Sequence, residues 1–244
     1  MYLLLIGAFL TIVNTMTLPP CIPKCYINDP KISECIMKTA NKARPRIATG
    51  IEPIGIPPFN PLILRNFVVT HKALDANFTA KAENFTFYGM QHYEIVDVGF
   101  CPKKLILKGK VKFGNIHAFT SYCMKGHIIS IPVTGKGYFK GLMGPGHIDF
   151  IIKGESVKIR DVEYIKLRDV DLKFTISTFL MNFKGLQQES GPWGDTNNAL
   201  RAKPEAVAKA VAPVFQKVFE AYLTKYLKWF FKEVSFSELF PRSH

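Results

Sequence analysis

The feature that most constrains this chain is a long, mostly apolar helix predicted near the C-terminus. Pro204-Glu205 opens the helix, and the pattern continues to about Lys232, roughly 43 Å at 1.5 Å per residue. Pro213 lies on the polar side and is expected to kink the helix. A helix that is apolar around most of its circumference needs to be enclosed by other parts of the chain. The narrow polar stripe consists of Glu205, Lys209, Gln216, Glu220, Thr224 and Lys228.

A long β region precedes this helix and can supply the enclosure. It is predicted to extend from Asn66 to about Ser177, with turns at Gly114-Asn115, Gly135-Lys136-Gly137 and Gly144-Pro145-Gly146. Strands follow strands without intervening helices, so the sheet is expected to be antiparallel. The sequence therefore predicts an α+β fold in which a sheet wraps around the long helix. The clearest alternating apolar runs are Leu105, Leu107, Gly109, Val111 and Phe113, and Val170, Leu172, Phe174 and Ile176.

A shorter helix is predicted ahead of the β region. Asp29-Pro30 is a favourable start, because Asp can cap free amides and proline suits the first helical position. Apolar residues follow at helical spacing until Pro45, which is expected to end the helix. Residues 50–61 contain four prolines, which exclude regular structure there.

The N-terminus indicates export from the cell. Residues 1–17 carry no charged side chain, and the apolar run from Tyr2 to Val13 is too short to span a bilayer. We therefore expect a signal peptide at residues 1–17, followed by a single domain at residues 18–244 of a secreted, extracellular protein. The alternative is a buried N-terminal strand or helix. The chain has five cysteines, an odd number, so at least one thiol is free or pairs outside the chain.

The charge balance points to an anionic partner without identifying it. Lys and Arg total 32 against 19 Asp and Glu, a net charge of +13. One strand face carries Lys104, Lys108, Lys110 and Lys112. This lysine face is either an ordinary solvated surface or a surface for transient contact with anionic membranes. Nucleic acid is not an expected partner, because the protein is expected to be exported.

Motifs for catalysis and metal binding are missing from the sequence. It contains no G-x-S-x-G elbow, no H-E-x-x-H and no P-loop, and the six histidines lack the spacing of metal ligands. Cys123 and His127 are four apart on a β segment, so they share a face without touching. Cys21 and Cys25 have no second pair of ligands nearby. We therefore predict no enzyme activity, no metal and no cofactor.

Four motifs, in order along most of the chain, resemble the insect Takeout and juvenile-hormone-binding protein family. They are Cys25-x3-Asp29-Pro30-x4-Cys35; Gly50-Ile51 with Gly55-Ile56-Pro57-Pro58-Phe59-Asn60-Pro61-Leu62; Tyr122-x3-Gly126 leading into Ile131-Pro132-Val133-x-Gly135-x-Gly137; and Phe236-Ser237-Glu238-Leu239-Phe240-Pro241. The extra Cys21 and the segment Phe183-Lys184-Gly185-Leu186 depart from the family pattern.

The resemblance implies a fold and a function. The fold is TULIP-like: a long C-terminal helix wrapped by a highly curved antiparallel sheet that encloses an apolar tunnel. The function is that of a secreted, monomeric carrier for a small lipophilic ligand, such as juvenile hormone, a fatty acid or a similar terpenoid or lipid. Two alternatives stay open: a solid core in place of the tunnel, and a basic membrane- or surface-binding defence protein on the same fold.

Candidate ligand-binding residues follow from combining the apolar faces with this resemblance. On the sheet they are Leu105, Leu107, Val111, Phe113, Phe174 and Ile176; on the helix they are Val207, Val211, Phe215, Phe219 and Tyr222. The Tyr222 hydroxyl could orient a polar head group.

Covalent features are expected outside the ligand site. The resemblance favours a disulfide between Cys25 and Cys35, which would pin the first helix to the incoming chain. A second bridge between Cys101 and Cys123, which flank the Gly114-Asn115 turn, is possible. Asn77-Phe78-Thr79 and Asn84-Phe85-Thr86 are glycosylation sequons. By strand parity Asn77 points outward, whereas Asn84 has the parity of the apolar face unless a bulge intervenes.

Overall fold

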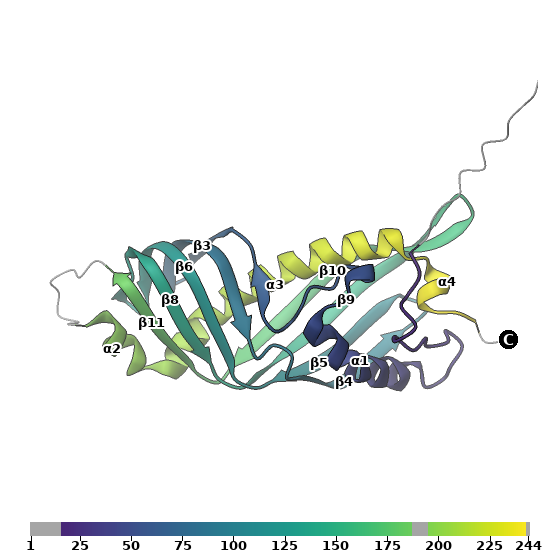
Figure 1. The fold of residues 1–244 in the computed structure, drawn as a ribbon, viewed down its shortest axis with the longest axis horizontal. Helices are drawn as coiled ribbons and strands as arrows, with labels where there is room; N and C mark the ends of the chain where they lie inside the picture. Colours follow the sequence, from purple (N-terminus) through teal and green to yellow (C-terminus); the bar gives the residue numbers. More distant parts are fainter. Residues whose placement is uncertain (1–15, 187–194, 243–244) are drawn as a thin grey trace, which may run out of the picture.

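The structure of the chain, a computed structural model, describes residues 16–186 and 195–242 (Figure 1). Most of the expected signal peptide, residues 1–15, lies outside the described residues. The helices are α1 (Ile32–Thr49), the 3-10 helix η1 (Glu52–Ile54), α2 (Thr196–Arg201), α3 (Pro204–Glu233) and α4 (Phe236–Leu239). The strands are β1 (Leu62–Leu64), β2 (Phe67–Lys72), β3 (Ala76–Tyr88), β4 (Tyr93–Cys101), β5 (Ile106–Phe113), β6 (Ile116–Ile128), β7 (Ile131–Pro132), β8 (Gly135–Met143), β9 (Gly146–Ile159), β10 (Val162–Ile176) and β11 (Phe179–Leu186).

These strands form two antiparallel sheets. The first has seven strands in the order β1-β3-β6-β8-β11, with β2 also paired to β3 and β7 to β6. Because β6 occupies one side of β3, β1 and β2 share its other side and form the edge of this sheet. The second sheet has four strands in the order β10-β9-β5-β4. The antiparallel prediction is confirmed, but two sheets take the place of the single one that was expected.

The chain crosses between the sheets at two of the predicted turns. Gly114-Asn115 lies between β5 of the second sheet and β6 of the first, and Gly144-Pro145 returns the chain from β8 to β9. Neither turn therefore forms a hairpin. The third predicted turn, at Gly135-Lys136-Gly137, was wrong, because these residues begin strand β8, which pairs with both β6 and β11.

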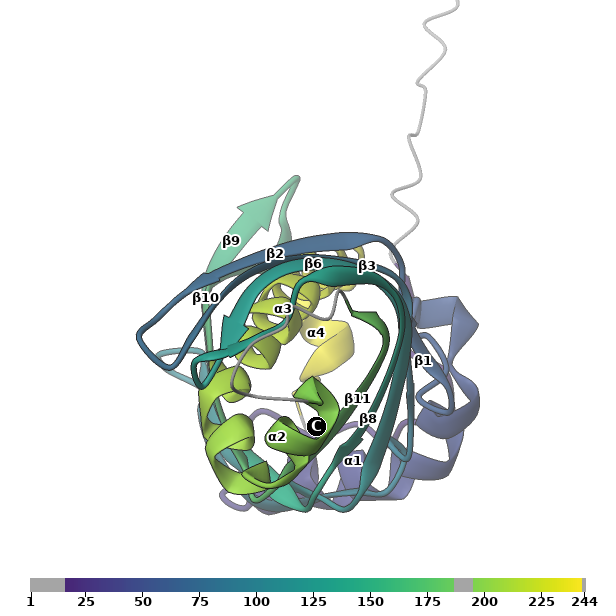
Figure 2. The ribbon, with the colours of Figure 1, turned by 90° about the vertical axis from the view of Figure 1, so that its left-hand side faces the viewer.

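Helix α3 confirms the prediction from sequence at both ends and runs through Pro213, which is exposed. Its first half is enclosed: Val207, Val211 and Phe215 are buried against the concave face of the seven-stranded sheet. Figure 2 shows β2, β3 and β6 arching over this part of the helix, with β8 and β11 continuing the curve. The second half leaves the curved sheet, and Trp229 there is 39% exposed. The helix is therefore enclosed along only part of its length.

The same helix joins the two sheets. Phe219 stacks on Phe174 of β10, with ring centroids 5.5 Å apart, and lies 5.7 Å from the ring of Phe87 in β3. The backbone N–H of Leu172 in β10 donates a hydrogen bond of 2.9 Å to the Glu220 carboxylate. Helix α3 thus bridges strand β10, at the edge of one sheet, and the curved surface of the other.

The first helix departs from the prediction at Pro45. Helix α1 includes this proline and ends only at Thr49, followed by the cap residue Gly50, whose φ of 88° suits glycine. Contacts with β4 hold the turn of the helix that immediately precedes the proline. Arg44 donates to the Tyr93 carbonyl at 2.8 Å, and the Asn41 amide donates to the Ile95 carbonyl at 2.8 Å. Tertiary contacts therefore outweigh the cost of an interior proline.

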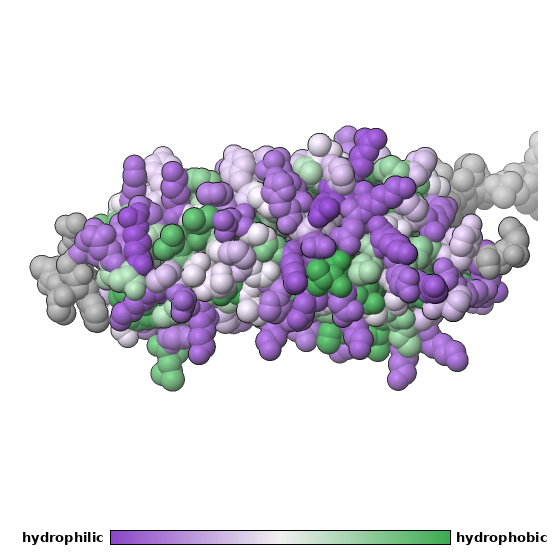
Figure 3. Space-filling view, turned by 90° about the horizontal axis from the view of Figure 1, so that it is seen from below, coloured by the Kyte–Doolittle hydropathy of each residue, from purple (hydrophilic) through white to green (hydrophobic). Residues whose placement is uncertain are grey.

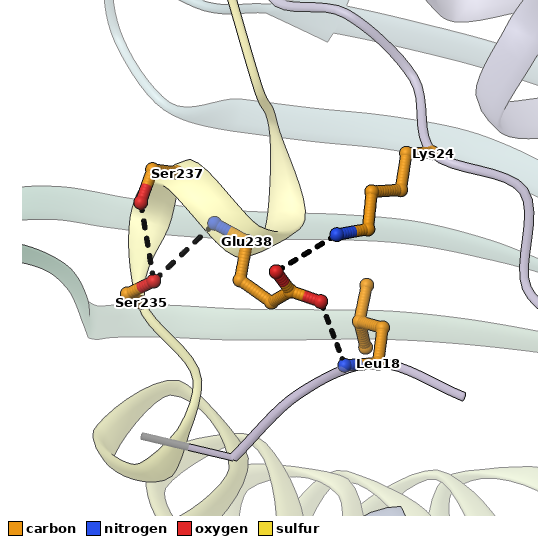
Figure 4. Close-up of polar contacts among 5 residues, drawn as sticks. All are labelled: Leu18, Lys24, Ser235, Ser237 and Glu238. Carbon is orange, nitrogen blue, oxygen red and sulfur yellow. Dashed lines mark hydrogen bonds and ion pairs between the residues drawn. The ribbon is translucent and has the colours of Figure 1, made fainter. Parts of the chain in front are cut away.

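Glu238 of α4 fastens the N-terminal segment to the C-terminal end of the fold (Figure 4). Its carboxylate accepts a 2.8 Å hydrogen bond from the Leu18 backbone N–H and another of 2.8 Å from the Lys24 ammonium group. Burial opposes ionisation, but these donors outweigh it and lower the pKa of Glu238. Ser235 caps α4 by accepting from the Glu238 backbone N–H at 3.3 Å.

The cysteine pairing is confirmed for one bridge and wrong for the other. Cys25 and Cys35 form a disulfide that ties the segment before α1 to the first turn of this helix. Cys101 and Cys123 are unpaired and exposed, as is Cys21. The chain changes sheets at Gly114-Asn115, so the two cysteines of the expected second bridge lie on different sheets.

Replacing both Cys25 and Cys35 with serine is expected to lower the free energy of unfolding by about 2–3 kcal/mol. The bridge closes a short loop, with a sequence separation of 10, and restricts the unfolded chain. Urea unfolding without reductant measures the change, and Cys21→Ser is the matched control because that thiol is unpaired. Equal stability of the double variant and the control would show that the bridge does not form.

The exterior is predominantly polar on the face drawn in Figure 3, where hydrophobic patches are small and separated. Among the described residues, no helix combines the length and the hydropathy needed to cross a membrane.

Candidate ligand-binding site

An apolar cavity of about 90 Å³ lies between α3 and the concave face of the seven-stranded sheet. Its accessible inner surface is entirely apolar. The wall consists of Phe67, Val69, Phe78, Ala80, Lys81, Ala82, Phe85, Phe87, Thr120, Tyr122, Met124, Ile128, Phe139, Met181, Phe183, Val211, Val214, Phe215 and Val218.

Strand alternation explains why so many aromatic side chains face this cavity. In β3, Phe78 and Ala82 point inward because successive side chains alternate between the two faces of a sheet. A bulge between Glu83 and Thr86 shifts this alternation by one residue. As a result, Phe85 and Phe87 also face the cavity. Without the bulge, the alternation would continue unchanged, and Phe85 and Phe87 would point away from the cavity.

Aromatic rings pack closely around the cavity. The ring centroids of Phe85 and Phe87 are 4.5 Å apart, those of Phe139 and Phe183 are 5.0 Å apart, and the Phe85 ring lies 6.3 Å from that of Phe215. Such pairs contribute about 0.5–1.5 kcal/mol each beyond the burial of their area. The aromatic cluster of the wall is therefore assembled from β3, β8, β11 and α3 together.

The polar groups of the wall already have partners. The Thr120 hydroxyl oxygen lies 2.9 Å from the Glu83 carbonyl oxygen. The Tyr122 hydroxyl donates to the Lys184 carbonyl at 3.2 Å. Burial, with a smaller effect from Cys123, raises the pKa of Tyr122 to about 12, so this phenol stays neutral. Neither hydroxyl is therefore needed to satisfy a ligand.

A larger open groove of about 790 Å³ runs outside the cavity, between α3 and the β1–β2 edge of the sheet. Phe67, Val69 and Val218 line both the groove and the cavity. These three side chains therefore form the partition between an open surface and an apolar interior. The other residues along the groove are Ile63, Leu64, Arg65, Val68, Thr70, Lys217, Ala221, Tyr222, Lys225, Tyr226 and Trp229.

The residues predicted from sequence to bind ligand fall into several places. Val211 and Phe215 line the cavity, and Tyr222 lines the groove. Three others are buried in the surrounding core without lining the cavity: Val207, Phe113 and Ile176. Two stack on each other where α3 meets the second sheet: Phe174 and Phe219. The remaining three belong to β5 or the turn before it, in the second sheet and outside the cavity wall: Leu105, Leu107 and Val111.

Sequence reasoning missed most of the cavity wall. The inward residues of β3, β6 and β11 alternate as clearly as those of β5, and Phe78, Phe85 and Met124 could have been found from that signal. The sequence does not reveal which strands belong to the sheet that curves around α3. That assignment depends on strand pairing between distant segments.

Both sequons lie on the outer surface. Asn77 is exposed, in agreement with its strand parity. Asn84 is also exposed, because it lies in the bulge of β3, where its φ is 52°. The bulge thus turns outward a residue whose parity alone would place it inside.

Two of the four lysines of the lysine face, Lys110 and Lys112, lie opposite acidic residues of neighbouring strands. Lys110 forms a 3.3 Å ion pair with Asp149 of β9 and lies opposite Asp97 of β4. Lys112 lies opposite Glu94. This arrangement is typical of a solvated sheet surface with cross-strand charge pairs. It gives no specific support to a membrane-binding role for this face.

Comparisons with known proteins place the chain among similar sequences and folds. Residues 3–241 match the profile of the family described as haemolymph juvenile hormone binding protein (JHBP). No curated protein sequence matches the chain. The crystal structure of Takeout 1 from Epiphyas postvittana superposes with a TM-score of 0.72 at 19% identity, covering 88% of this chain and 98% of that one. A structure of lipopolysaccharide binding protein gives a TM-score of only 0.28 at 12% identity, over 68% of this chain and 35% of that one, too low to establish a shared fold.

Proposed function

This chain belongs to the haemolymph juvenile hormone binding protein family, and from that premise we propose that it carries one small lipophilic molecule in the cavity and groove beside α3. Proteins of this family bind ligands and are not enzymes. The candidate ligands are juvenile hormone, a fatty acid or a similar terpenoid or lipid.

The observation that carries this proposal is the apolar cavity separated from an open groove by only three side chains. The cavity of about 90 Å³ is smaller than ordinary ligand pockets of about 300–1,000 Å³. A ligand of lipid size therefore uses the groove as well, with an apolar part passing Phe67, Val69 and Val218. Burial of each methylene would contribute about 0.8 kcal/mol.

Secretion and a monomeric state are part of the same proposal. The uncharged N-terminal run, the Cys25–Cys35 bridge and the two exposed sequons all suit an exported protein. The carrier is proposed to act as a monomer, because the candidate cavity and groove are built from one chain.

The purified protein is expected to bind a fluorescent fatty-acid probe with one-to-one stoichiometry. Titration followed by emission gives the stoichiometry, and competition with unlabelled juvenile hormone and palmitic acid ranks the two ligand classes. Mass spectrometry of organic extracts from natively purified protein then identifies the bound molecule. Failure of every probe and competitor to bind, with no lipid in the extract, would contradict the carrier function.

A further inference from the structure

One buried polar side chain next to the cavity has no partner. His71 of β2 is only 5% exposed, and neither of its ring nitrogens has a hydrogen-bond partner among the described residues. Buried polar groups are nearly always satisfied, and an unsatisfied one costs about 1–3 kcal/mol. Such a group in a ligand-free protein points to a partner that arrives from outside.

The position of His71 connects it to the candidate ligand site. Phe67, Val69 and His71 share one face of β2, and the first two line both the cavity and the groove. Directly across the strand pair, His71 lies opposite Phe78, another cavity residue, and the two ring centroids are 6.0 Å apart. His71 therefore adjoins the end of the cavity, at the edge where β2 faces α3.

The charges along the groove favour an anion. Arg65, Lys217 and Lys225 line the groove, and no Asp or Glu is among its lining residues. None of these three cations forms an ion pair within the described part of the chain. The groove therefore offers uncompensated positive charge beside an apolar interior.

Two charged groups act directly on His71. Burial has the largest effect and lowers the pKa of His71, the Lys217 charge lowers it further, and Asp75 in the β2–β3 turn opposes them in part. The imidazole is therefore neutral in the ligand-free protein near neutral pH. A bound anion would reverse part of this effect, because an opposite charge stabilises the protonated ring.

We propose that the ligand is an amphipath with a carboxylate head, which His71 and Lys217 bind while its apolar chain enters the phenylalanine-lined cavity. This inference rests on the proposed carrier function and names the chemistry of its ligand. The carboxylate supplies the partner that the ring nitrogens of His71 lack, and it neutralises Lys217 at the mouth of the groove. A neutral lipid would fill the same cavity but would leave the cations uncompensated.

The first test compares dodecanoic acid with methyl dodecanoate, which differ only in the head group. Both displace a neutral fluorescent probe, and the acid is expected to bind about tenfold more tightly than the ester, as for a charge-assisted hydrogen bond. In His71→Leu and in Lys217→Gln the affinity for the acid should fall toward that for the ester, while the ester is unaffected. Lys228→Gln, an exposed cation of α3 outside the groove, is the matched control.

Two further readouts separate ligand binding from a purely structural role of His71. His71→Leu is expected to raise the melting temperature of the ligand-free protein, because it removes a buried unsatisfied group without opening a large cavity. The affinity of the wild type for the acid should rise as the pH falls from about 8 to about 6, as His71 gains a proton in the complex. This pH dependence should weaken in His71→Leu and persist in the Lys228→Gln control.

The outcomes that overturn the inference differ from those that overturn the carrier function. Equal affinities for acid and ester in the wild type would refute a carboxylate-reading site and leave the carrier function standing. A lower melting temperature in His71→Leu, together with an unchanged preference for the acid in Lys217→Gln, would also refute it. If the neutral probe itself does not bind and the protein takes up neither ligand nor any other lipid, both the inference and the proposed function are wrong.

Discussion

Replacing Phe179 with alanine is expected to lower the free energy of unfolding by about 3–5 kcal/mol. Phe179 is fully buried at the start of β11, and its ring packs edge-on against those of Phe139, at 6.2 Å, and Phe215, at 5.5 Å. It thus joins the curved sheet to α3. Truncation would remove this contact and leave a void that the rigid sheet cannot close. Urea unfolding followed by circular dichroism measures the loss.

Leu180→Ala is the control for this experiment. Leu180 is the next residue of the same strand, but its side chain points outward and is 40% exposed. Its truncation should change the stability by no more than about 0.5 kcal/mol. Similar losses for the two variants would show that α3 does not pack against β11 in the way the structure describes.

Replacing Val218 with tryptophan is expected to weaken binding of the fatty-acid probe about a hundredfold. Val218 is part of the partition between groove and cavity, so a bulky side chain there blocks the passage whether it turns inward or outward. If about four methylenes are kept out of the cavity, the loss is about 3 kcal/mol, which corresponds to that factor. Probe titration measures the affinity.

A tryptophan elsewhere on the same helix provides the comparison. Ala206 of α3 is exposed and lies outside both the cavity and the groove, so Ala206→Trp should leave probe binding unchanged. The far-ultraviolet circular dichroism of both variants should match the wild type. Normal binding by a folded Val218→Trp protein would mean that the ligand does not pass between α3 and the β2 edge.

Features that depend on residues close together in the chain were predictable from the sequence. Helix α3 begins at Pro204, as expected, and ends at Glu233, within one residue of the expected end. The strand Val162–Ile176 contains the predicted alternating run, and the Cys25–Cys35 bridge forms as the family resemblance implied. Each of these depends on residues that are close together in the chain, so their pattern is visible without knowledge of the fold.

Predictions that needed long-range information failed. The expected bridge between Cys101 and Cys123 assumed that strands on either side of Gly114-Asn115 are neighbours, but the chain changes sheets there. For the same reason Leu105, Leu107 and Val111 were assigned to the ligand site although they lie in the other sheet. Pro45 was expected to end the first helix. Helix α1 instead continues through this proline, and long-range contacts between the preceding turn and β4 support it.

By itself, the sequence determined the kind of protein: an α+β carrier fold with one long helix, an antiparallel β region and an apolar interior. Hydrophobic periodicity fixes which side of each element is buried, because burial follows from the spacing of apolar residues along one helix or strand. It does not fix what that side contacts. Only the tertiary structure decided that β2 and α3 border a basic groove, and that three side chains separate this groove from the cavity. It also decided that His71 is buried next to the cavity residue Phe78 with no hydrogen-bond partner among the described residues. Those arrangements depend on pairing between segments far apart in the chain, for which neither spacing nor composition leaves a local signal.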